Sequence, residues 1–316
     1  MILVTGCTGY IGFHICESLE LKKIPYFGVD NFSRSTPKNI INKKKFLKID
    51  INSNDIIRII KLKKIDTIIH TAAFSYPPES EKNQKIYYNN NIQKTKKFIN
   101  NCSKMKIKKF IFLSSSNVYN FNLSSIHPVK ENQKTNPENY YGKTKLVIEK
   151  YLKKKFSTCY ILRLFNIAGY TNKNKNEFYE YKNKFRRIMP VITEAFKKKI
   201  SLTINLVKKK NKLIYPARDF VHIQDFLNII LKINKKKTKG LNILNVGSGK
   251  LVYLDKIINI FEKKTNNFIS YKKRFYDVGN YNYTLGNNSR LKKKLNYKFK
   301  FNLNNIVKSC IDKKII

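Results

Sequence analysis

The sequence predicts an α/β protein, with a doubly wound parallel sheet and a second, smaller α/β domain. Two observations predict this fold class. Short apolar runs alternate with stretches of helical spacing through the first half of the chain, and this rhythm weakens after Asn166. Alternating strands and helices form parallel sheets that helices cover on both faces. At roughly 150 residues per domain, we expect one domain at 1–168 with a later return around 218–246, and a substrate domain at 169–316.

The apolar runs define the expected strands, and regularly spaced apolar residues define the helices. Strands are expected at 2–5, 26–30, 46–50, 67–73, 110–114 and 159–164, and a later one at 241–246. Ile11, Ile15 and Leu19 lie four residues apart, which is helical spacing. Further helices are expected around 56–60, 92–102 and 145–152, and in the second half at 189–199, 218–233 and 252–263. The polar stretch 171–187 is interpreted as a loop or a domain junction.

Composition excludes several classes of protein. Hydrophobic residues make up 42% of the chain, with 21 Phe and 20 Tyr, which is enough for a full core. The longest stretch without a charged residue, 110–129, contains five Ser, three Asn and a Pro, so no membrane span is expected. The five Cys form no CxxC pair, and Met1 is followed at once by the first apolar run. A reduced, cytoplasmic protein without a disulfide frame or a metal site is therefore expected.

The formal net charge of +45 has two interpretations. Clustered basic residues neutralise phosphates in nucleic-acid-binding proteins. Here, however, Lys triplets recur along the whole chain, and only eight of the 65 basic residues are Arg. This distribution favours the codon bias of a low-GC genome, so no dedicated nucleic-acid site is expected. The charge should still attract anionic ligands in general.

A phosphate-binding turn is expected between the first strand and the first helix. Gly6, Gly9 and Gly12 have the spacing GxxGxxG. Glycines allow a tight turn and let backbone amides approach a pyrophosphate at the start of a helix. Asp30 ends the second strand, where a carboxylate binds the adenosine ribose and repels a 2′-phosphate, which favours NAD over NADP. Arg34 is near enough to leave NADP open.

A tyrosine, a lysine and a serine are the candidate catalytic residues. Tyr141 and Lys145 are four residues apart and so share one helical face. A tyrosine with its ordinary pKa of about 10 is a poor base at neutral pH. A nearby ammonium and a positive nicotinamide ring can lower that pKa. Ser115, at the end of the fifth strand, can orient a substrate oxygen. A surface Tyr beside one of many Lys, and a polar turn, are the alternative interpretations.

Together these motifs resemble the extended short-chain dehydrogenase/reductase family. Within it, the chain is most similar to the NAD-dependent epimerase/dehydratases that act as nucleotide-sugar 4-epimerases. The resemblance runs along nearly the whole chain. Besides the motifs above, it rests on these segments: Val29-Asp30-Asn31, Ile69-His70-Thr71-Ala72-Ala73, Asn89-Asn90-Asn91-Ile92, Arg163-Leu164-Phe165-Asn166, Arg218-Asp219-Phe220-Val221-His222 and Asn245-Val246-Gly247-Ser248-Gly249. The fold that it implies is Rossmann-like.

The resemblance also implies roles for individual residues. Ser115, Tyr141 and Lys145 would be catalytic, with Lys145 lowering the pKa of the tyrosine. The implied NAD-binding residues are Gly6, Gly9, Tyr10, Ile11, Gly12, Asp30, Asn31, Asp50, Ile51, Ala72, Ala73, Asn91, Tyr141 and Lys145. The implied substrate-binding residues are Ser115, Asn117, Asn166, Arg187, Arg218 and Arg274.

The implied activity is epimerisation, and the absence of the acidic pair typical of 4,6-dehydratases disfavours that alternative. A sugar hydroxyl, most simply at C4 of a UDP-sugar, is oxidised to a ketone, and the hydride then returns to the opposite face. The substrate half matches the family less well: Lys94 replaces a usual glycine, and Arg187 replaces a frequent Asn. A nucleotide-sugar reductase, dehydrogenase or decarboxylase therefore stays open, as does a dinucleotide-binding protein without catalysis. The resemblance also implies a homodimer, which is typical of the family.

Overall fold

The central feature of the fold is a seven-stranded parallel sheet. The structure, a computed structural model, describes residues 1–121, 126–171, 178–179, 187–209, 212–237, 239–276 and 283–312. The strands lie in the order β11-β6-β5-β4-β1-β2-β3. Their bounds are β1 (Ile2–Thr5), β2 (Tyr26–Asp30), β3 (Phe46–Lys48), β4 (Thr67–His70), β5 (Lys109–Ser115), β6 (Thr158–Leu164) and β11 (Gly240–Val246). The doubly wound parallel sheet predicted from the sequence is confirmed.

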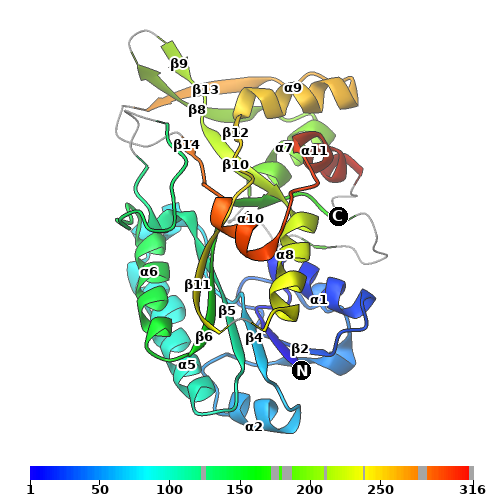
Figure 1. The fold of residues 1–316 in the computed structure, drawn as a ribbon. Helices are drawn as coiled ribbons and strands as arrows, with labels where there is room; N and C mark the ends of the chain where they lie inside the picture. Colours follow the sequence, from blue (N-terminus) through cyan, green and yellow to red (C-terminus); the bar gives the residue numbers. More distant parts are fainter. Residues whose placement is uncertain are drawn as a thin grey trace.

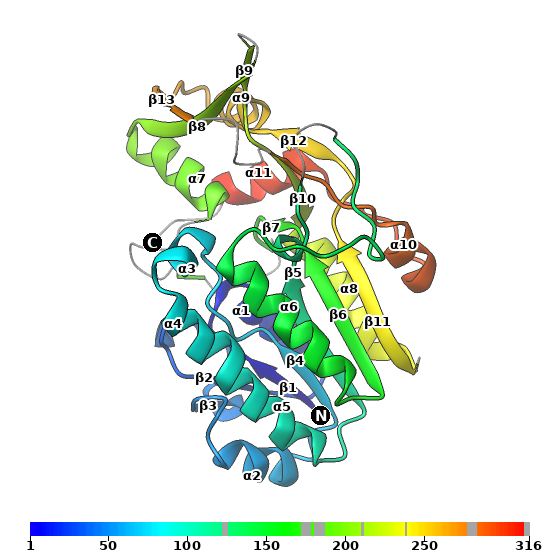
Figure 2. The same ribbon diagram turned by 90° about the vertical axis from the view of Figure 1, so that its left-hand side faces the viewer.

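Helices cover both faces of this sheet, as Figures 1 and 2 show. One face carries α1 (Tyr10–Leu21) and α8 (Ile223–Lys235), and the other carries α2 (Asp55–Leu62), α5 (Thr95–Ser103) and α6 (Tyr140–Lys153). Both faces bury apolar side chains: Ile15, Leu19 and Phe226 on the first, and Ile56, Phe98 and Ile148 on the second. This double burial is why the strands are continuous apolar runs and not alternating ones.

Shorter elements connect the main ones and shape one side of the sheet. They are α3 (Pro77–Lys82), α4 (Gln84–Tyr87), the π-helix Tyr88–Lys94, and the 3-10 helices Pro37–Asn39, Lys43–Lys45 and Ser116–Val118. Pro77 and Pro78 open α3, a position where proline is well tolerated because the first amides of a helix have no partner within the helix. The strands expected at 46–50 and 67–73 end earlier, at Lys48 and His70, and the chain then turns into the cleft described below.

The smaller domain lies across the carboxyl ends of the central strands (Figure 1). It contains β7 (Asn166–Ala168), β10 (Ala217–His222), β12 (Leu251–Tyr253) and β14 (Tyr283–Thr284), and a second sheet of β8 (Leu202–Lys209), β9 (Lys212–Ile214) and β13 (Tyr271–Tyr276). Its helices are α7 (Ile188–Lys198), α9 (Leu254–Thr265) and α11 (Leu303–Asp312), whereas α10 (Ser289–Leu295) packs against α8 and β11 of the central sheet. A separate apolar core lies among α7, α9 and α11.

The single helix predicted at 218–233 is wrong in its first part. Residues Ala217–His222 form β10, and the helix begins only at Ile223. These residues form a strand because they pair with β7, β12 and β14, and this pairing outweighs their local helical pattern. Similarly, β12 takes the first residues of the helix expected at 252–263. Most of the stretch 171–187 lies outside the described residues.

The chain returns from the smaller domain to the central sheet through α8 and β11. β11 pairs with β6 along its whole length, from Gly240 to Val246. Lys109 ties this return to β5: its buried amine donates to the carbonyl oxygens of Ile233, Asn234 and Lys236 at 2.7, 2.7 and 2.8 Å. These carbonyls close α8, where a cation is favourable.

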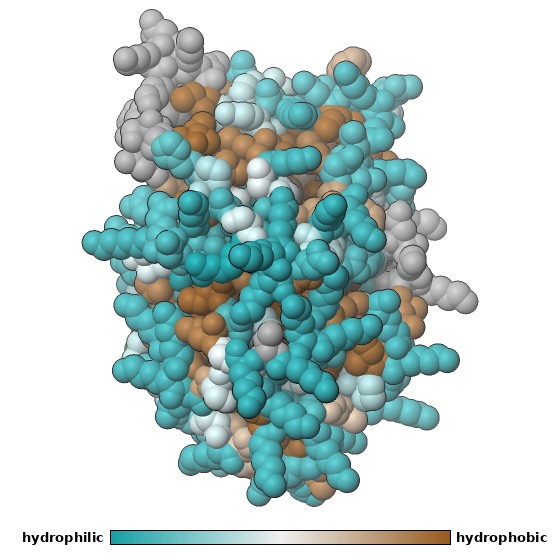
Figure 3. Space-filling model, viewed as in Figure 1, coloured by the Kyte–Doolittle hydropathy of each residue, from teal (hydrophilic) through white to brown (hydrophobic). Residues whose placement is uncertain are grey.

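The surface is predominantly hydrophilic. Figure 3 shows teal side chains over most of one face, with smaller brown patches between them. Among the helices of the described residues, none is both long enough and apolar enough to span a membrane.

Candidate active site

A cleft lies where the carboxyl ends of the central strands face the smaller domain. Its volume is about 620 Å³, within the range of roughly 300–1,000 Å³ that is usual for small-molecule sites. Residues that follow β1, β2, β4, β5 and β6 line it from the sheet, and Tyr170, Arg187, Arg218 and Phe220 line it from the other side. Doubly wound sheets bind their ligands in this crevice.

The glycine-rich turn forms one wall of the cleft. Gly6 has a φ of +66°, and a Cβ there would lie 2.7 Å from the backbone nitrogen of Ala72. A Cβ on Gly12 would overlap the carbonyl oxygen of Gly6. The helix α1 starts after Gly9 without a side-chain cap and without an acidic residue in its first turn. Its positive end therefore faces the cleft without a carboxylate in its own first turn, which suits a pyrophosphate.

Asp30 ends β2 beside this turn and is held by three hydrogen bonds. It accepts from the amides of Thr8 at 3.1 Å and Phe32 at 2.9 Å, and from the Ser35 hydroxyl at 3.1 Å. The carboxylate is buried yet lines the cleft. A fixed carboxylate at this place suits the hydroxyl groups of an adenosine ribose. The glycine turn and Asp30 thus fit the two ends of an ADP moiety.

A second carboxylate, Asp50, lies two residues beyond the end of β3, the strand that pairs with β2. Its Oδ2 accepts from Asn31 Nδ2 at 2.9 Å and from Lys94 Nζ at 2.6 Å. Burial raises the pKa of Asp50, but the bonds from Lys94 and Asn31 outweigh it and lower the pKa below its ordinary value. Asp50 is therefore ionised at neutral pH, and Lys94 is its cationic partner.

The candidate catalytic residues come from β5 and α6. Asn139 caps α6, since its Oδ1 accepts from the Gly142 amide at 2.8 Å. Tyr141 and Lys145 lie on the buried face of that helix. Lys145 Nζ donates to the Leu113 carbonyl at 2.8 Å and lies 5.8 Å from the centre of the Tyr141 ring. Ser115, Tyr141 and Lys145 all line the cleft, as the sequence predicts.

Burial dominates the protonation of this group. It raises the pKa of Tyr141 to about 12, although a hydrogen bond with the Ser115 side chain lowers it. It lowers the pKa of Lys145 to about 7, although the Glu149 carboxylate raises it. The shift of Tyr141 is opposite to the one expected from Lys145. Desolvation of a phenolate outweighs the effect of an amine that itself loses its proton near pH 7.

A buried ion pair lies behind Lys145, and the sequence analysis missed it. Arg163 Nη2 donates to Glu149 Oε2 at 2.8 Å, and Arg163 Nε to Glu149 Oε1 at 3.1 Å. Arg163 also donates to the Tyr119 hydroxyl at 2.8 Å, and Ser114 Oγ donates to Glu149 Oε1 at 2.5 Å. Glu149 follows Lys145 by four residues, the same spacing that links Tyr141 to Lys145, so helical spacing could have placed Glu149 on this face, although not its partner Arg163.

Most of the predicted site residues line the cleft. This holds for all the predicted NAD-binding residues except Asn91, and for Ser115, Asn166, Arg187 and Arg218 among the substrate-binding ones. Arg187 lies over the ring of Tyr10, with 3.3 Å between its Cζ and the ring centre. This contact puts its guanidinium beside the start of α1.

Three predicted residues are not among those that line the cleft. Asn117 Nδ2 donates to Ser115 Oγ at 3.0 Å and therefore helps to position a candidate catalytic residue. Asn91 bonds both backbone groups of Phe74 at 2.9 Å. Arg274 is exposed on β13.

Several aromatic residues of the cleft were not predicted. They are Phe74, Tyr76, Tyr170, Phe178 and Tyr179. Phe74 and Tyr76 directly follow the predicted Ala72 and Ala73 at the end of β4, so their position was available as a signal. Tyr170, Phe178 and Tyr179 adjoin or lie in a polar stretch without periodicity, which gives no such signal. In the described parts of the chain, no group of three or more His, Cys, Asp or Glu could hold a metal ion.

Comparison with known proteins agrees with this geometry. The model of the NAD dependent epimerase/dehydratase family matches residues 2–247. A UDP-glucose 4-epimerase of Dictyostelium discoideum is 29% identical over 292 residues, which is 86% of this chain and 83% of that protein. The crystal structure of UDP-glucose 4-epimerase from Brucella ovis in complex with NAD has a TM-score of 0.89 at 22% identity, covering 98% and 97% of the two chains.

A further similar solved structure is that of a 4-epimerase named for a different UDP-sugar. The UDP-N-acetylglucosamine 4-epimerase from Methanobrevibacter ruminantium M1, in complex with UDP-N-acetylmuramic acid, has a TM-score of 0.83 at 25% identity. The match covers 98% of this chain and 97% of that one.

Proposed function

Because the chain belongs to the NAD dependent epimerase/dehydratase family, we propose that it is a nucleotide-sugar epimerase that inverts C4 of a UDP-sugar. The family makes it an NAD-dependent enzyme. One observation carries the proposal: Ser115, Tyr141 and Lys145 meet in a single cleft with the amide-lined start of α1 and with Asp30. The names of its relatives support the substrate class, since those quoted above are 4-epimerases of UDP-sugars.

The two domains divide the work in this proposal. The central sheet and its helices, including the return through α8 and β11, hold NAD, and the smaller domain, which contains β7 and β10, holds the sugar nucleotide. The first amides of α1 bind the pyrophosphate of the coenzyme, and Asp30 binds its adenosine ribose. Held there, NAD would supply the hydride acceptor for oxidation at C4 of the sugar and the hydride donor for reduction of the ketone from its opposite face.

The side chains of the protein manage the proton of the C4 hydroxyl. Ser115 orients this hydroxyl, and Tyr141 takes its proton as a general base and later gives it back. For this the pKa of Tyr141 must fall from about 12. Positive charge from the Lys145 ammonium and from the coenzyme ring acts in that direction. The Leu113 carbonyl holds the Lys145 amine in place for this role.

Two arginines are suited to the diphosphate of the substrate. Arg187 and Arg218 line the cleft on the side of the smaller domain. Guanidinium groups match phosphate oxygens in a planar, two-pronged geometry that an ammonium lacks. Asn166 lines the cleft near them and would bind the nucleotide portion. Arg274, exposed on β13, stays a prediction from the family resemblance alone.

The test is epimerisation by the purified protein without added coenzyme. UDP-glucose and UDP-N-acetylglucosamine are incubated separately, and the products are separated by anion-exchange chromatography. We expect Tyr141→Phe to lower kcat by about 10²- to 10⁴-fold. Tyr140→Phe, which alters the neighbouring and less buried ring, is the matched control and should be active. Unchanged epimerisation by Tyr141→Phe would contradict the assigned base.

The same assay separates the remaining possibilities. Stoichiometric release of reduced coenzyme into solution would indicate a reductase, dehydrogenase or decarboxylase. Binding of NAD without turnover of any sugar nucleotide would indicate a protein that only binds the dinucleotide. A homodimer, favoured by the family resemblance, and a cytoplasmic location, favoured by five cysteines without a CxxC pair, complete the proposal. Light scattering after size-exclusion chromatography tests the first, and cell fractionation tests the second.

A further inference from the structure

Arg34 occupies the place from which an arginine would bind the 2′-phosphate of NADP. It follows β2, four residues after Asp30, and lines the cleft together with Asn31, Ser33 and Ser35. In dinucleotide-binding sheets, an arginine near the end of the second strand accommodates this phosphate. The inference below rests on the proposed placement of the coenzyme in this cleft.

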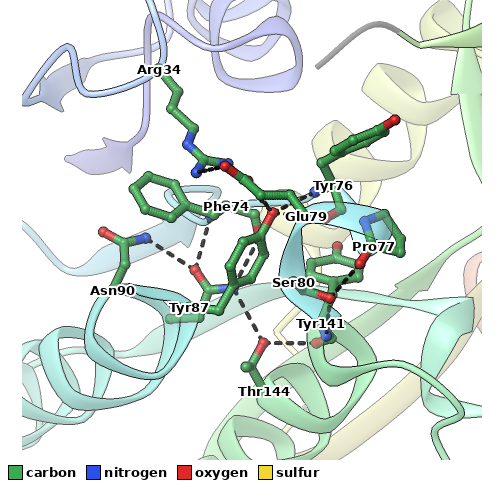
Figure 4. Close-up of polar contacts among 11 residues, drawn as sticks. Arg34, Phe74, Tyr76, Pro77, Glu79, Ser80, Tyr87, Asn90, Tyr141 and Thr144 are labelled. Carbon is green, nitrogen blue, oxygen red and sulfur yellow. Dashed lines mark hydrogen bonds and ion pairs between the residues drawn. The ribbon is translucent and has the colours of Figure 1, made fainter. Parts of the chain in front are cut away.

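The guanidinium of Arg34 is already engaged by a carboxylate. Its Nη1 lies 2.6 Å from Glu79 Oε2, and its Nη2 donates to Glu79 Oε1 at 2.9 Å. Both prongs of the arginine therefore meet both oxygens of one carboxylate, which is the strongest geometry for such a pair. The guanidinium carbon of Arg34 lies over the ring of Phe74, 3.5 Å from the ring centre. Figure 4 shows the two side chains next to each other.

Glu79 is itself fixed in position. The buried Tyr87 hydroxyl lies 2.8 Å from Glu79 Oε2 and 2.8 Å from the Tyr76 carbonyl oxygen, and it accepts from the Tyr76 amide at 3.1 Å. The next residue, Ser80, accepts from the amide of Tyr141 at 3.0 Å. The short helix α3 thus holds Glu79 between Arg34 and the start of α6 (Figure 4).

We propose that Glu79 is a specificity-determining residue that makes the site selective for NAD. Glu79 pairs with both Nη atoms of Arg34. The guanidinium that could bind a 2′-phosphate is therefore already occupied. Asp30, four residues before Arg34, itself repels that phosphate. NADP could recruit Arg34 only by breaking a pair that Phe74 and Tyr87 hold together. The ambiguity that Arg34 creates in the sequence is resolved by a residue 45 positions later.

Competition between the two dinucleotides tests this role. Wild type and variants are equilibrated with equal concentrations of NAD and NADP, unbound nucleotide is removed, and the bound ratio is measured by chromatography. We expect Glu79→Gln to raise the NADP:NAD ratio about tenfold, the scale of one charge-assisted bond. Glu81→Gln is the matched control, because it removes the same charge from an exposed position of the same helix. It should leave the ratio unchanged.

Two arginine variants complete the test. Arg34→Met in the Glu79→Gln background should abolish the gain of NADP. Arg34→Met alone should leave the wild-type NADP:NAD ratio unchanged, because Glu79 already occupies the arginine in the wild type. This measurement tests the inference even if the Glu79→Gln variant does not fold.

The outcomes separate this role from the proposed function. No gain with Glu79→Gln, an equal gain with Glu81→Gln, or a loss of NADP with Arg34→Met alone would each overturn the inference. Wild-type protein that binds neither dinucleotide would overturn the coenzyme placement and the inference with it. No sugar nucleotide is present, so a failure of the epimerase proposal does not affect the result.

Discussion

Breaking the buried ion pair behind Lys145 should be among the most destabilising single changes in this chain. Arg163→Met leaves the Glu149 carboxylate, whose side chain is only 1% exposed, without its cationic partner. The change removes the bonds from Arg163 to Glu149 at 2.8 and 3.1 Å. At about 1.5–3 kcal/mol for each hydrogen bond to a charged group, the free energy of unfolding should fall by about 3–5 kcal/mol, the range known for broken buried pairs.

The double variant Glu149→Met/Arg163→Met is the matched comparison. It removes both charges, and replacing a whole buried ion pair by apolar residues of similar size is often close to neutral. We therefore expect most of the lost stability to return. Equilibrium unfolding in urea, followed by circular dichroism, measures both differences, provided that the slope with denaturant stays the same.

Either of two results would contradict a strongly stabilising buried pair. One is a loss below about 1 kcal/mol for Arg163→Met, which would mean that the pair is worth no more than a surface one. The other is a double variant as unstable as the sum of the two single variants, which would mean that the two side chains do not interact.

Three other predictions concern the glycine turn, the buried amine of β5 and the catalytic lysine. Gly12→Ala should lower the unfolding temperature and abolish dinucleotide binding, because its Cβ would overlap the Gly6 carbonyl oxygen; Gly9→Ala, whose Cβ would lie 3.5 Å from that oxygen, should not lower the unfolding temperature. Lys109→Met should cost about 1–3 kcal/mol of stability in urea unfolding, because the carbonyls that end α8 lose their donor; Lys108→Met, at an amine site that is 81% exposed, should cost less than about 0.5 kcal/mol. The pKa of Lys145 is lowered to about 7 from its ordinary 10.5, so the folded state binds fewer protons than the unfolded one between these values, and stability should rise with pH there. Relative to Lys145→Met, the wild type should gain about 1.4 kcal/mol per pH unit between pH 7 and 9; parallel stability curves would contradict the assigned shift.

The sequence predicts the coenzyme half of this molecule well for a physical reason. Parallel strands buried on both faces must be apolar throughout, so β1 and β2 are visible as runs, and the turn between β1 and α1 must be glycine-rich to approach a phosphate. The strand at Ala217–His222 was predicted as helix because its residues join directly to those of α8, and only its partners in the smaller domain show the difference.

The contacts that tune the site were much less predictable. Glu79 meets Arg34 across 45 residues, and Arg163 meets Glu149 across two different elements. Neither pair can be predicted from residue spacing along one helix or strand, because each depends on how a loop or a strand lies against another element. The direction of the pKa shift of Tyr141 was also missed, since it depends on the extent of burial, which spacing along a helix does not give.

The late return of the chain through α8 and β11 has a consequence for synthesis. β6 obtains its outer neighbour only when residues 240–246 have been made, long after β6 itself leaves the ribosome. Until then its apolar edge, with Ile161 and Leu162, is open to pairing with other nascent chains. The first domain therefore cannot complete its folding during translation of its own segment. A gene truncated after Ala168 should yield an aggregating product that depends on chaperones, and no stable coenzyme-binding fragment.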